Sequence, residues 1–271
     1  MKKKPVRIFN RFVKREDARC YIMAYKPSPM PDNSFYTPIE CGAVLHDRHF
    51  AIRDDMSSDN ISSLNPAYAE NTGIYWVWKN HPTDLKYIAI CQYRRQLDLR
   101  QDVNLDNMFR DCDAMGAYLT CNEIRQGVAT VREQFCVWHN PKWLDICEDI
   151  IKKDYSWFLP AWQQYVNEGD KIYASNCFVM KVVDFENYCS LLFGILEKFM
   201  NVYGGTVESL REKIEEEIAS GEFEDKLSQG RGYLYQLFAP AFLAERILTA
   251  YIQSLGTVKR LNYNCIKEMF A

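Results

Sequence analysis

Two adjacent arginines follow an apolar run in the first half of the sequence and could bind an anion. Residues 87–91, Tyr-Ile-Ala-Ile-Cys, predict a short buried strand, and Arg94 and Arg95 follow it after two residues. Each guanidinium presents a planar fork of donors that matches phosphate oxygens, so two could neutralise a diphosphate without a metal. Paired arginines are more often solvated loop cations, and the position of the strand in a sheet must distinguish the two interpretations.

An acidic loop supplies a second group of candidates. Asp54, Asp55, Asp59 and Asn60 lie just before a predicted helix. Carboxylate and amide groups in a loop could bind ribose hydroxyls or a cation. The same residue types also cap helices and close turns, and this is their commoner role.

The sequence contains few patterns typical of metal sites. Asp111 and Asp113 match the Asp-x-Asp pattern that many sugar-nucleotide enzymes use to hold a divalent cation such as Mg or Mn. The pattern should follow a strand, but here it precedes one, so no metal site is predicted with these residues. The four histidines show no metal-ligand spacing. Among them, His139 lies in a mixed polar and aromatic segment and could contact a substrate.

The elements that must position these residues alternate between strands and helices and end in a helical part. We predict strands at 20–25, 41–45, 87–92 and 116–120, and a strand or strand pair at 172–182. We predict helices at 65–80, 104–110, 143–155, 184–203, 207–227 and 234–255, the last kinked at Pro240. This order predicts an α/β fold with a mainly parallel sheet flanked by helices. In such sheets ligands bind beyond the carboxyl ends of the strands, which is where Arg94 and Arg95 are expected.

Composition excludes several classes of protein. The chain has 271 residues, 48% of them hydrophobic and 25% charged, with a net charge of −3. A general nucleic-acid binder would be expected to be basic, so no nucleic-acid partner is predicted. Ten cysteines are scattered singly without a Cys-x-x-Cys pair, and we find no secretory signal or long apolar stretch. We therefore expect reduced thiols in a cytoplasmic protein.

The first residues could contact a membrane. Residues 1–15 carry seven lysines and arginines interleaved with apolar side chains on one helical face. This pattern suits peripheral contact with the anionic inner leaflet of the plasma membrane, although a solvated terminus is the commoner case. We predict a basic N-terminal segment at 1–18 and a single domain at 19–271, with a charged helical excursion at 204–230.

Several blocks of the chain together resemble a known family. They run in order from Tyr21 to Ile252, and the most specific block combines Asn-Pro-Ala-Tyr, Tyr-Trp-Val-Trp-Lys-Asn and the strand that ends in Tyr93-Arg94-Arg95. These blocks resemble a bacterial family of capsular and exopolysaccharide-synthesis glycosyltransferases, first catalogued as a domain of unknown function. The resemblance implies a GT-A-type, Rossmann-like fold. It also implies transfer of a hexose, foremost galactofuranose from UDP-galactofuranose, to a growing cell-surface polysaccharide or lipid-linked glycan.

The resemblance assigns roles to the candidates. An inverting transferase needs a base for the acceptor hydroxyl and positive charge for the departing diphosphate. Glu245 and His139 are the candidate bases, with Asp154 behind them. The expected donor-binding residues are Arg94, Arg95, Asp54, Asp55, Asp59, Asn60, Gln92, Asn176 and Lys26. Acceptor-binding or structural roles are expected for Glu70, Trp78 and Arg246, and Glu245 and Arg246 could form a buried ion pair.

Departures from the family pattern keep a second hypothesis open. The family usually has histidine where this chain has Gln92, and His-Lys where it has Tyr25 and Lys26. The alternative is a catalytically silent member that binds a sugar nucleotide or acts as a scaffold. An unrelated α/β protein is the third and weakest hypothesis, because so many ordered matches rarely arise by chance.

Overall fold

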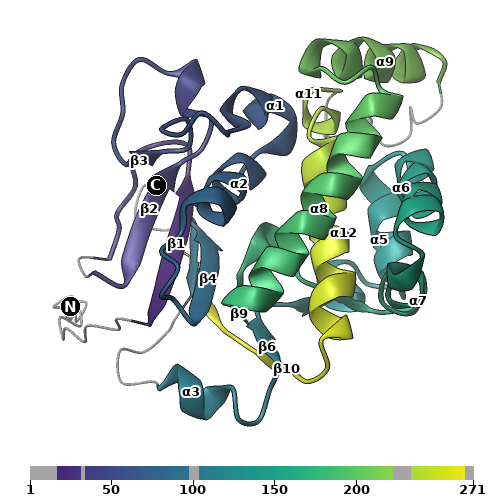
Figure 1. Ribbon diagram of the computed structural model, residues 1–271. Coiled ribbons are helices and arrows are strands. Elements are labelled where there is room, and N and C mark those ends of the chain that lie inside the picture. The colour runs from purple at the N-terminus through teal and green to yellow at the C-terminus, as the bar shows by residue number, and fades with distance from the viewer. Residues whose placement is uncertain (1–16, 32–33, 98–103, 222–232, 266–271) are drawn as a thin grey trace, which may run out of the picture.

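The computed structural model describes residues 17–31, 34–97, 104–221 and 233–265 (Figure 1). The possible membrane-contact segment 1–15 and part of the charged excursion, 222–230, lie outside these residues. Within the described part of the chain, no helix has the length and apolarity needed to cross a bilayer. The nine cysteines whose side chains are described are free thiols.

Nine of the strands in the described ranges form one sheet. They are β1 Ala18–Ala24, β2 Tyr36–Glu40, β3 Ile52–Arg53, β4 Tyr87–Gln92, β5 Arg95–Leu97, β6 Ala114–Gly116, β9 Phe178–Lys181, β10 Val258–Arg260 and β11 Tyr263–Cys265. Their order is β10-β6-β9-β4-β1-β2-β3, and β5 connects β4 with β11. A separate pair consists of β7 Leu119–Thr120 and β8 Lys171–Ile172.

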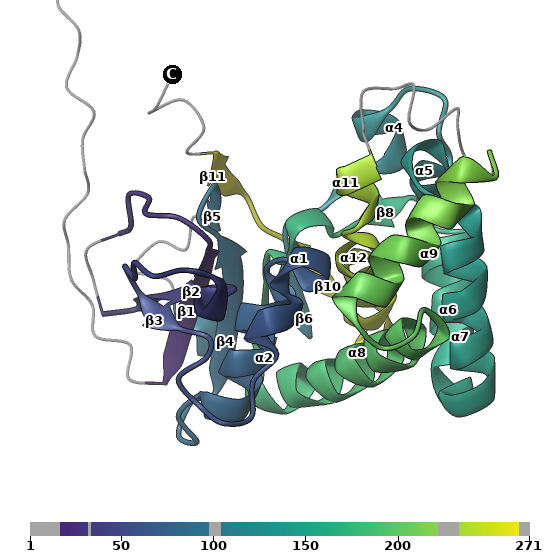
Figure 2. The ribbon, with the colours of Figure 1, turned by 90° about the horizontal axis from the view of Figure 1, so that it is seen from above.

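The helices lie mostly on one side of this sheet (Figures 1 and 2). Their bounds are α1 Asn65–Tyr68, α2 Asn71–Asn80, α3 Leu105–Met108, α4 Cys121–Ile124, α5 Val131–Trp138, α6 Pro141–Asp154, α7 Leu159–Trp162, α8 Val182–Val202, α9 Val207–Ala219, α11 Tyr233–Gln236 and α12 Ala239–Ser254. Helices α2 and α8 contact the sheet strands, and α12 packs against α8.

The alternating side chains of β1 show how the two faces are filled. Tyr21 and Met23 point into the larger core, which contains the buried residues of α2, α8 and α12. Cys20 and Ile22 point to the opposite face, where a smaller core includes residues of α3. Successive strand residues face opposite sides, and both sides of this sheet are buried, which explains why the strand sequences are almost continuously apolar.

The predicted architecture is confirmed, although the sheet is mixed. Strands β1, β2, β3 and β4 run parallel, and β9 runs antiparallel to both β4 and β6. The predicted strand 87–92 coincides with β4. The helix predicted at 207–227 begins as α9, which ends at Ala219, and residues 222–227 lie outside the described ranges.

The predicted strand at 41–45 is wrong. The strand ends at Glu40, and residues 43–45 form a single helical turn. Gly42 has a φ of +72°, a left-handed conformation that extended strands do not contain. The buried Asp54 carboxylate accepts the backbone N–H groups of Gly42 and Ala43, at 2.8 and 3.0 Å, and thereby stabilises the turn.

Of the two forms predicted for 172–182, the structure has two strands, β8 and β9. Three further predicted elements are divided. The helix expected at 65–80 breaks at Ala69 into α1 and α2, and the strand expected at 116–120 is shared between β6 and β7. The closing helix is interrupted before Ala239, with Pro240 in the first turn of α12 rather than at an interior kink. Proline fits there because first-turn N–H groups have no helical partner.

One edge of the sheet gathers the ends of several strands. Gln92 lies beside Met23 near the ends of β4 and β1, and Ala24 lies beside Glu40 at the ends of β1 and β2. Because β9 is antiparallel to β4, with Phe178 opposite Ile90, the residues before β9 lie at this same edge. We call it the carboxyl edge.

Helix α2 lies unusually close to the sheet. A Cβ atom built on Gly73 would come within 2.6 Å of both Cys41 Sγ and Met23 Sδ. Only glycine permits this approach, so the start of α2 is held against the carboxyl edge.

Candidate functional site

Glu70, which precedes the first residue of α2, joins three segments at the carboxyl edge. Its Oε1 accepts hydrogen bonds from Gln92 Nε2 at 2.6 Å and from Asn176 Nδ2 at 2.9 Å. Gln92 ends β4, and Asn176 lies two residues before β9. Two predicted donor-binding residues, Gln92 and Asn176, thus contact Glu70, for which an acceptor-binding or structural role was predicted.

The contact continues through Arg95 to α12. The Arg95 guanidinium donates to Ser175 Oγ and, at 3.4 Å, to Gln92 Oε1. The backbone N–H of Ser175 donates to Glu245 Oε1 at 2.7 Å. We call the connected residues Glu70, Gln92, Arg95, Ser175, Asn176 and Glu245 the polar cluster.

The polar cluster coincides with strained backbone. Ala69, Ser175 and Asn176 have φ values of 48°, 68° and 48°, and they are the non-glycine residues with positive φ in the described part of the chain. Residues with a Cβ seldom adopt this region, and such outliers concentrate at active sites and ligand-binding sites. All three adjoin or form the contact between Glu70 and Asn176.

The polar cluster is also electrostatically unusual. Burial raises the pKa of Glu70, and the Glu245 carboxylate raises it further, while hydrogen bonds from its own backbone N–H, from Asn176 and from Gln92 oppose the rise. Asn176 is fully buried, and its Oδ1 has no hydrogen-bond partner. An unpaired buried acceptor is costly and needs an explanation, which a functional role can supply.

Glu245 is held from two sides. Its Oε2 accepts a hydrogen bond from Arg246 at 2.9 Å, and its Oε1 accepts the Ser175 N–H. Arg246 is only 2% exposed, donates to the Gln134 side chain, and lies with its guanidinium 5.0 Å from the Phe135 ring centre. The expected ion pair is present, with a buried arginine and a carboxylate that is 19% exposed.

The remaining cations at the carboxyl edge lie on the surface. Arg94 is exposed, with its guanidinium 5.3 Å from the Tyr93 ring centre. Lys26 Nζ lies 5.8 and 5.9 Å from the ring centres of Tyr25 and Tyr93. Lys26 follows β1 and Arg94 follows β4. Because β1 and β4 are parallel neighbours, both charges lie at the carboxyl edge, as the polar cluster does.

The other two candidate bases have different surroundings. His139 is 2% exposed, its ring centre lies 4.0 Å from that of Phe242, and its Nδ1 lies 3.1 Å from Gln236 Oε1. Asp154, at the end of α6, pairs with Lys198 at 3.1 Å. Burial among aromatic rings favours a structural role for His139, and its catalytic role stays a prediction.

The acidic loop candidates all have partners that order the loop. Besides its two backbone contacts, Asp54 accepts the Ser62 hydroxyl at 2.5 Å. The Arg53 guanidinium lowers the pKa of Asp55, with which it forms an ion pair. Asp59 accepts a hydrogen bond from the Tyr75 hydroxyl at 2.6 Å. The Asn60 side chain donates to the backbone carbonyl of residue 57 and accepts from the backbone N–H of residue 62. These contacts favour capping and turn roles over donor binding.

Trp78 and the Asp-x-Asp residues also have local packing roles. The Trp78 ring stacks on Phe193 of α8, with ring centres 5.7 Å apart. Asp113 accepts the Thr257 backbone N–H at 2.9 Å, just before β10. Among the residues that the structure describes, no three His, Cys, Asp or Glu side chains come together as a group that could hold a metal ion.

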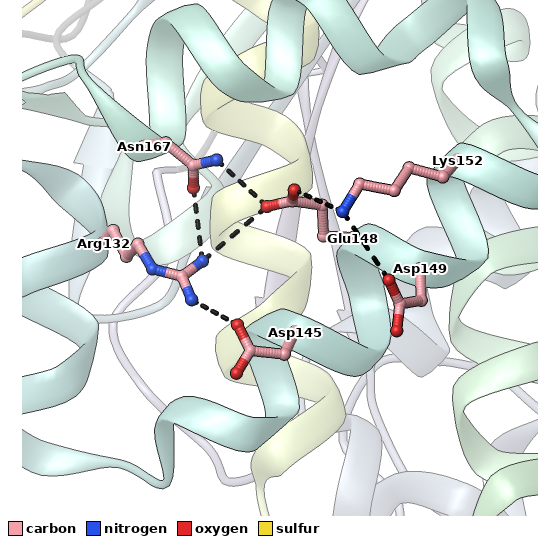
Figure 3. A pocket seen from close by; sticks show the side chains of 6 residues that line it. All are labelled: Arg132, Asp145, Glu148, Asp149, Lys152 and Asn167. Carbon is pink, nitrogen blue, oxygen red and sulfur yellow. Dashed lines mark hydrogen bonds and ion pairs between the residues drawn. The ribbon is translucent and has the colours of Figure 1, made fainter.

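A pocket of about 470 Å³ lies elsewhere, beside α5, α6 and the helical turn 163–167 (Figure 3). Its lining groups are already paired: Glu148 accepts from Lys152 at 2.9 Å and from Asn167 at 3.0 Å, and Arg132 pairs with Asp145. The remaining lining residue is Asp149. None of these residues belongs to the polar cluster, so the pocket is not part of the candidate site.

Ser175 was not among the residues predicted from the sequence. Its position depends on a left-handed backbone turn and on contacts with residues 70 to 80 positions away. The only local signal is the polar Ser175-Asn176 pair between two apolar segments.

Of three comparisons with known proteins, one bears on the fold. Residues 19–207 match a family model described as a domain of unknown function (DUF4422). No curated protein matches the chain. The apo structure of the bifunctional glycosyltransferase WbbM superposes with a TM-score of 0.69 at 20% identity, over 93% of this chain and 46% of that one. This chain therefore spans about half the length of that protein, and the expected glycosyltransferase-like α/β fold is confirmed.

Proposed function

The chain belongs to the family described as a domain of unknown function (DUF4422), and we propose that it is a glycosyltransferase that moves a hexose from a UDP-sugar to an acceptor hydroxyl. The observation that carries the proposal is the polar cluster. It links Arg95, through Gln92 and Ser175, to the carboxylates of Glu70 and Glu245 at the carboxyl edge of an α/β sheet, where such folds bind ligands.

The donor diphosphate would bind to the cations of this edge. Arg94 and Lys26 are exposed and free to turn toward an anion, whereas Arg95 is held by Ser175 and Gln92. A preorganised guanidinium stabilises the charge that develops on a departing diphosphate without reorganising during the reaction. Asn176 and Gln92, anchored to Glu70, would lie beside the donor sugar.

The reaction we propose is an inverting transfer. The acceptor oxygen forms a bond to the anomeric carbon as the bond between that carbon and the diphosphate oxygen breaks, and UDP departs with the bonding electrons. A base takes the acceptor proton. In the proposed step the protein's own cations, Arg94, Arg95 and Lys26, stabilise the departing diphosphate. Whether Mg or Mn also contributes is tested by adding EDTA.

The finer assignments follow from the family resemblance. We propose galactofuranose as the transferred hexose and a growing capsular or exopolysaccharide chain, or a lipid-linked glycan, as acceptor. Residues 1–15 would hold the protein at the inner leaflet, where lipid-linked acceptors are found.

The second candidate function is a silent sugar-nucleotide-binding or scaffolding protein. It is favoured by Gln92, whose amide stands where the resembling family usually has histidine and which is fully engaged with Glu70 and Arg95. An amide cannot exchange a proton as an imidazole can.

Two measurements separate these candidates. Calorimetric titration with UDP reports binding, and release of UDP from UDP-galactofuranose, UDP-galactose or UDP-glucose reports turnover. Binding with turnover supports the transferase, and binding without turnover supports the silent protein. Absence of both would reject the proposed function.

A further inference from the structure

The two carboxylate oxygens of Glu70 have different surroundings. Both amide donors, from Gln92 and Asn176, end on Oε1. In the described part of the chain no side chain donates to Oε2, and the residue keeps part of its surface open. A carboxylate that acts as a base needs this arrangement, because one oxygen fixes the orientation while the other stays available for the proton.

Glu245 lacks such an arrangement. The Ser175 N–H occupies its Oε1, and the Arg246 guanidinium occupies its Oε2. Both oxygens of this carboxylate are thus occupied by donors, and neither is left open to the proton of an acceptor hydroxyl. Glu245 is therefore better suited to hold the Ser175 turn and to maintain a negative charge near Glu70.

The backbone is strained on both sides of the contact between Glu70 and Asn176. Ala69, directly before it, has a φ of 48°, and its partner Asn176 has the same value. The Asn176 side-chain nitrogen donates to Glu70, which fixes Asn176 Oδ1 as the acceptor end of the amide. Asn176 Oδ1 is nevertheless buried without a hydrogen-bond partner. Strain and an unpaired acceptor on both sides of one carboxylate are costs typical of a functional group.

We propose that Glu70 is the catalytic base, with Oε2 removing the proton from the acceptor hydroxyl. This inference rests on the proposed function. The proton moves from the acceptor oxygen to Glu70 Oε2, and the acceptor oxygen forms the bond to the anomeric carbon. UDP leaves with the electrons of the broken bond, and Glu70 then returns its proton to water.

The groups that face Glu70 keep its proton affinity high. Cys41, Cys177 and Tyr188 interact with it electrostatically, and burial raises the pKa of each, so they stay neutral near pH 7. The charged groups are Glu245, which favours protonation of Glu70, and Arg95, which reaches it through Gln92. A base with a raised pKa accepts a proton more readily at neutral pH.

The test compares Glu70→Gln with the wild type. Glutamine can still accept the two amide hydrogen bonds but cannot take a proton. We expect UDP release from UDP-galactofuranose to slow by about 10²- to 10⁴-fold. The calorimetric Kd for UDP should stay within about twofold. The control Glu197→Gln, which removes an exposed carboxylate from α8, should leave both unchanged.

Two further measurements do not depend on how well Glu70→Gln folds. The wild-type rate should fall as the pH drops through the raised pKa of Glu70, and a rate independent of pH between about 5 and 9 would contradict the proposal. In Glu70→Ala, added formate should restore part of the rate, because a small carboxylate can replace a base but not a structural side chain.

The possible outcomes separate the assignment of Glu70 as the base from the proposed transferase function. If wild type turns over and Glu70→Gln does so within about threefold, the base assignment fails and the transferase proposal stands. If the wild type neither binds UDP nor releases it from any donor, the proposed function fails and the base assignment falls with it.

Discussion

Glu70 and Asn176, 106 residues apart in the sequence, are joined by a 2.9 Å hydrogen bond from the asparagine Nδ2 to the glutamate Oε1. Each of them directly follows a residue with a left-handed backbone, Ala69 or Ser175. The contact thus fixes two strained turns to one another, one before α2 and the other before β9. Disturbing either partner should affect both turns.

Asn176→Asp should destabilise the protein in a pH-dependent way. It removes the donor to Glu70 and places a second carboxylate against it, with an expected loss of about 3 kcal/mol at pH 7. The loss should shrink as the pH falls, because protonation of either carboxyl group relieves the repulsion. Thermal melts at several pH values measure this, with the exposed Asn107→Asp as control. Equal destabilisation at every pH would show that repulsion is not its cause.

Replacing either arginine by alanine should weaken UDP binding. A charge-assisted hydrogen bond contributes roughly 1.5–3 kcal/mol, which corresponds to about a 10- to 150-fold rise in Kd. Lysine should rescue only partly, since it lacks the planar fork. Because Arg94 is exposed and Arg95 bonds to Ser175, only Arg95→Ala should also lower the melting temperature. Unchanged Kd in both single variants and the double variant would remove the arginines from the donor site.

Asp54→Ala should unfold the acidic loop without changing the donor site. The substitution leaves the N–H groups of Gly42 and Ala43 and the Ser62 hydroxyl without their buried acceptor, at an expected cost of about 2–5 kcal/mol. Calorimetry on the folded variant should return the wild-type Kd for UDP. A large rise in Kd with an unchanged melting temperature would instead make Asp54 a donor-binding residue.

The ionised Glu70 carboxylate should lower the free energy of unfolding at neutral pH. Its folded pKa is raised, so the folded state binds more protons than the unfolded state between the ordinary glutamate pKa of 4.5 and the folded value. Stability therefore falls as the pH rises through this interval. Glu70→Gln removes that loss, and its melting temperature relative to wild type should rise from acidic to neutral pH. A difference that is constant with pH would contradict the raised pKa.

Removal of residues 1–15 should weaken binding to anionic vesicles. Seven basic side chains, each contributing about 1 kcal/mol near an anionic surface, should make the difference at least about tenfold. Sedimentation with phosphatidylserine-containing vesicles measures it, and neutral phosphatidylcholine vesicles serve as control. Equal binding by the full and shortened chains would reject a membrane role for this segment.

The strand 87–92 and the position of the arginines could be predicted because both depend on local order. An apolar run bounded by polar residues defines the strand, and the α/β alternation places its end at the ligand edge. The helix break at Ala69 could not be predicted, since Asn-Pro-Ala-Tyr-Ala-Glu-Asn-Thr contains no strong interior helix breaker. The break is accompanied by a local hydrogen bond from the Asn65 side chain to the Ala69 carbonyl and by the long-range hydrogen bond between Glu70 and Asn176.

The candidate base could not be identified from the sequence for a similar reason. Glu70 and Glu245 are both plausible carboxylates by type, and what separates them is which oxygen atoms are already occupied. That depends on Ser175 and Asn176, whose backbone conformation no local pattern encodes. The capping role of Asp54, by contrast, was among the interpretations that its residue type favoured.

The close approach at Gly73 has an evolutionary consequence. One turn of α2 separates this glycine from Glu70, and a single methyl group at position 73 would press on Cys41 and Met23 and lift the helix from the sheet. Such a change would carry the carboxylate away from Gln92 and Asn176 even though position 73 touches neither. Across diverging relatives, we therefore expect selection to keep glycine at this position while neighbouring α2 positions on the outer surface vary.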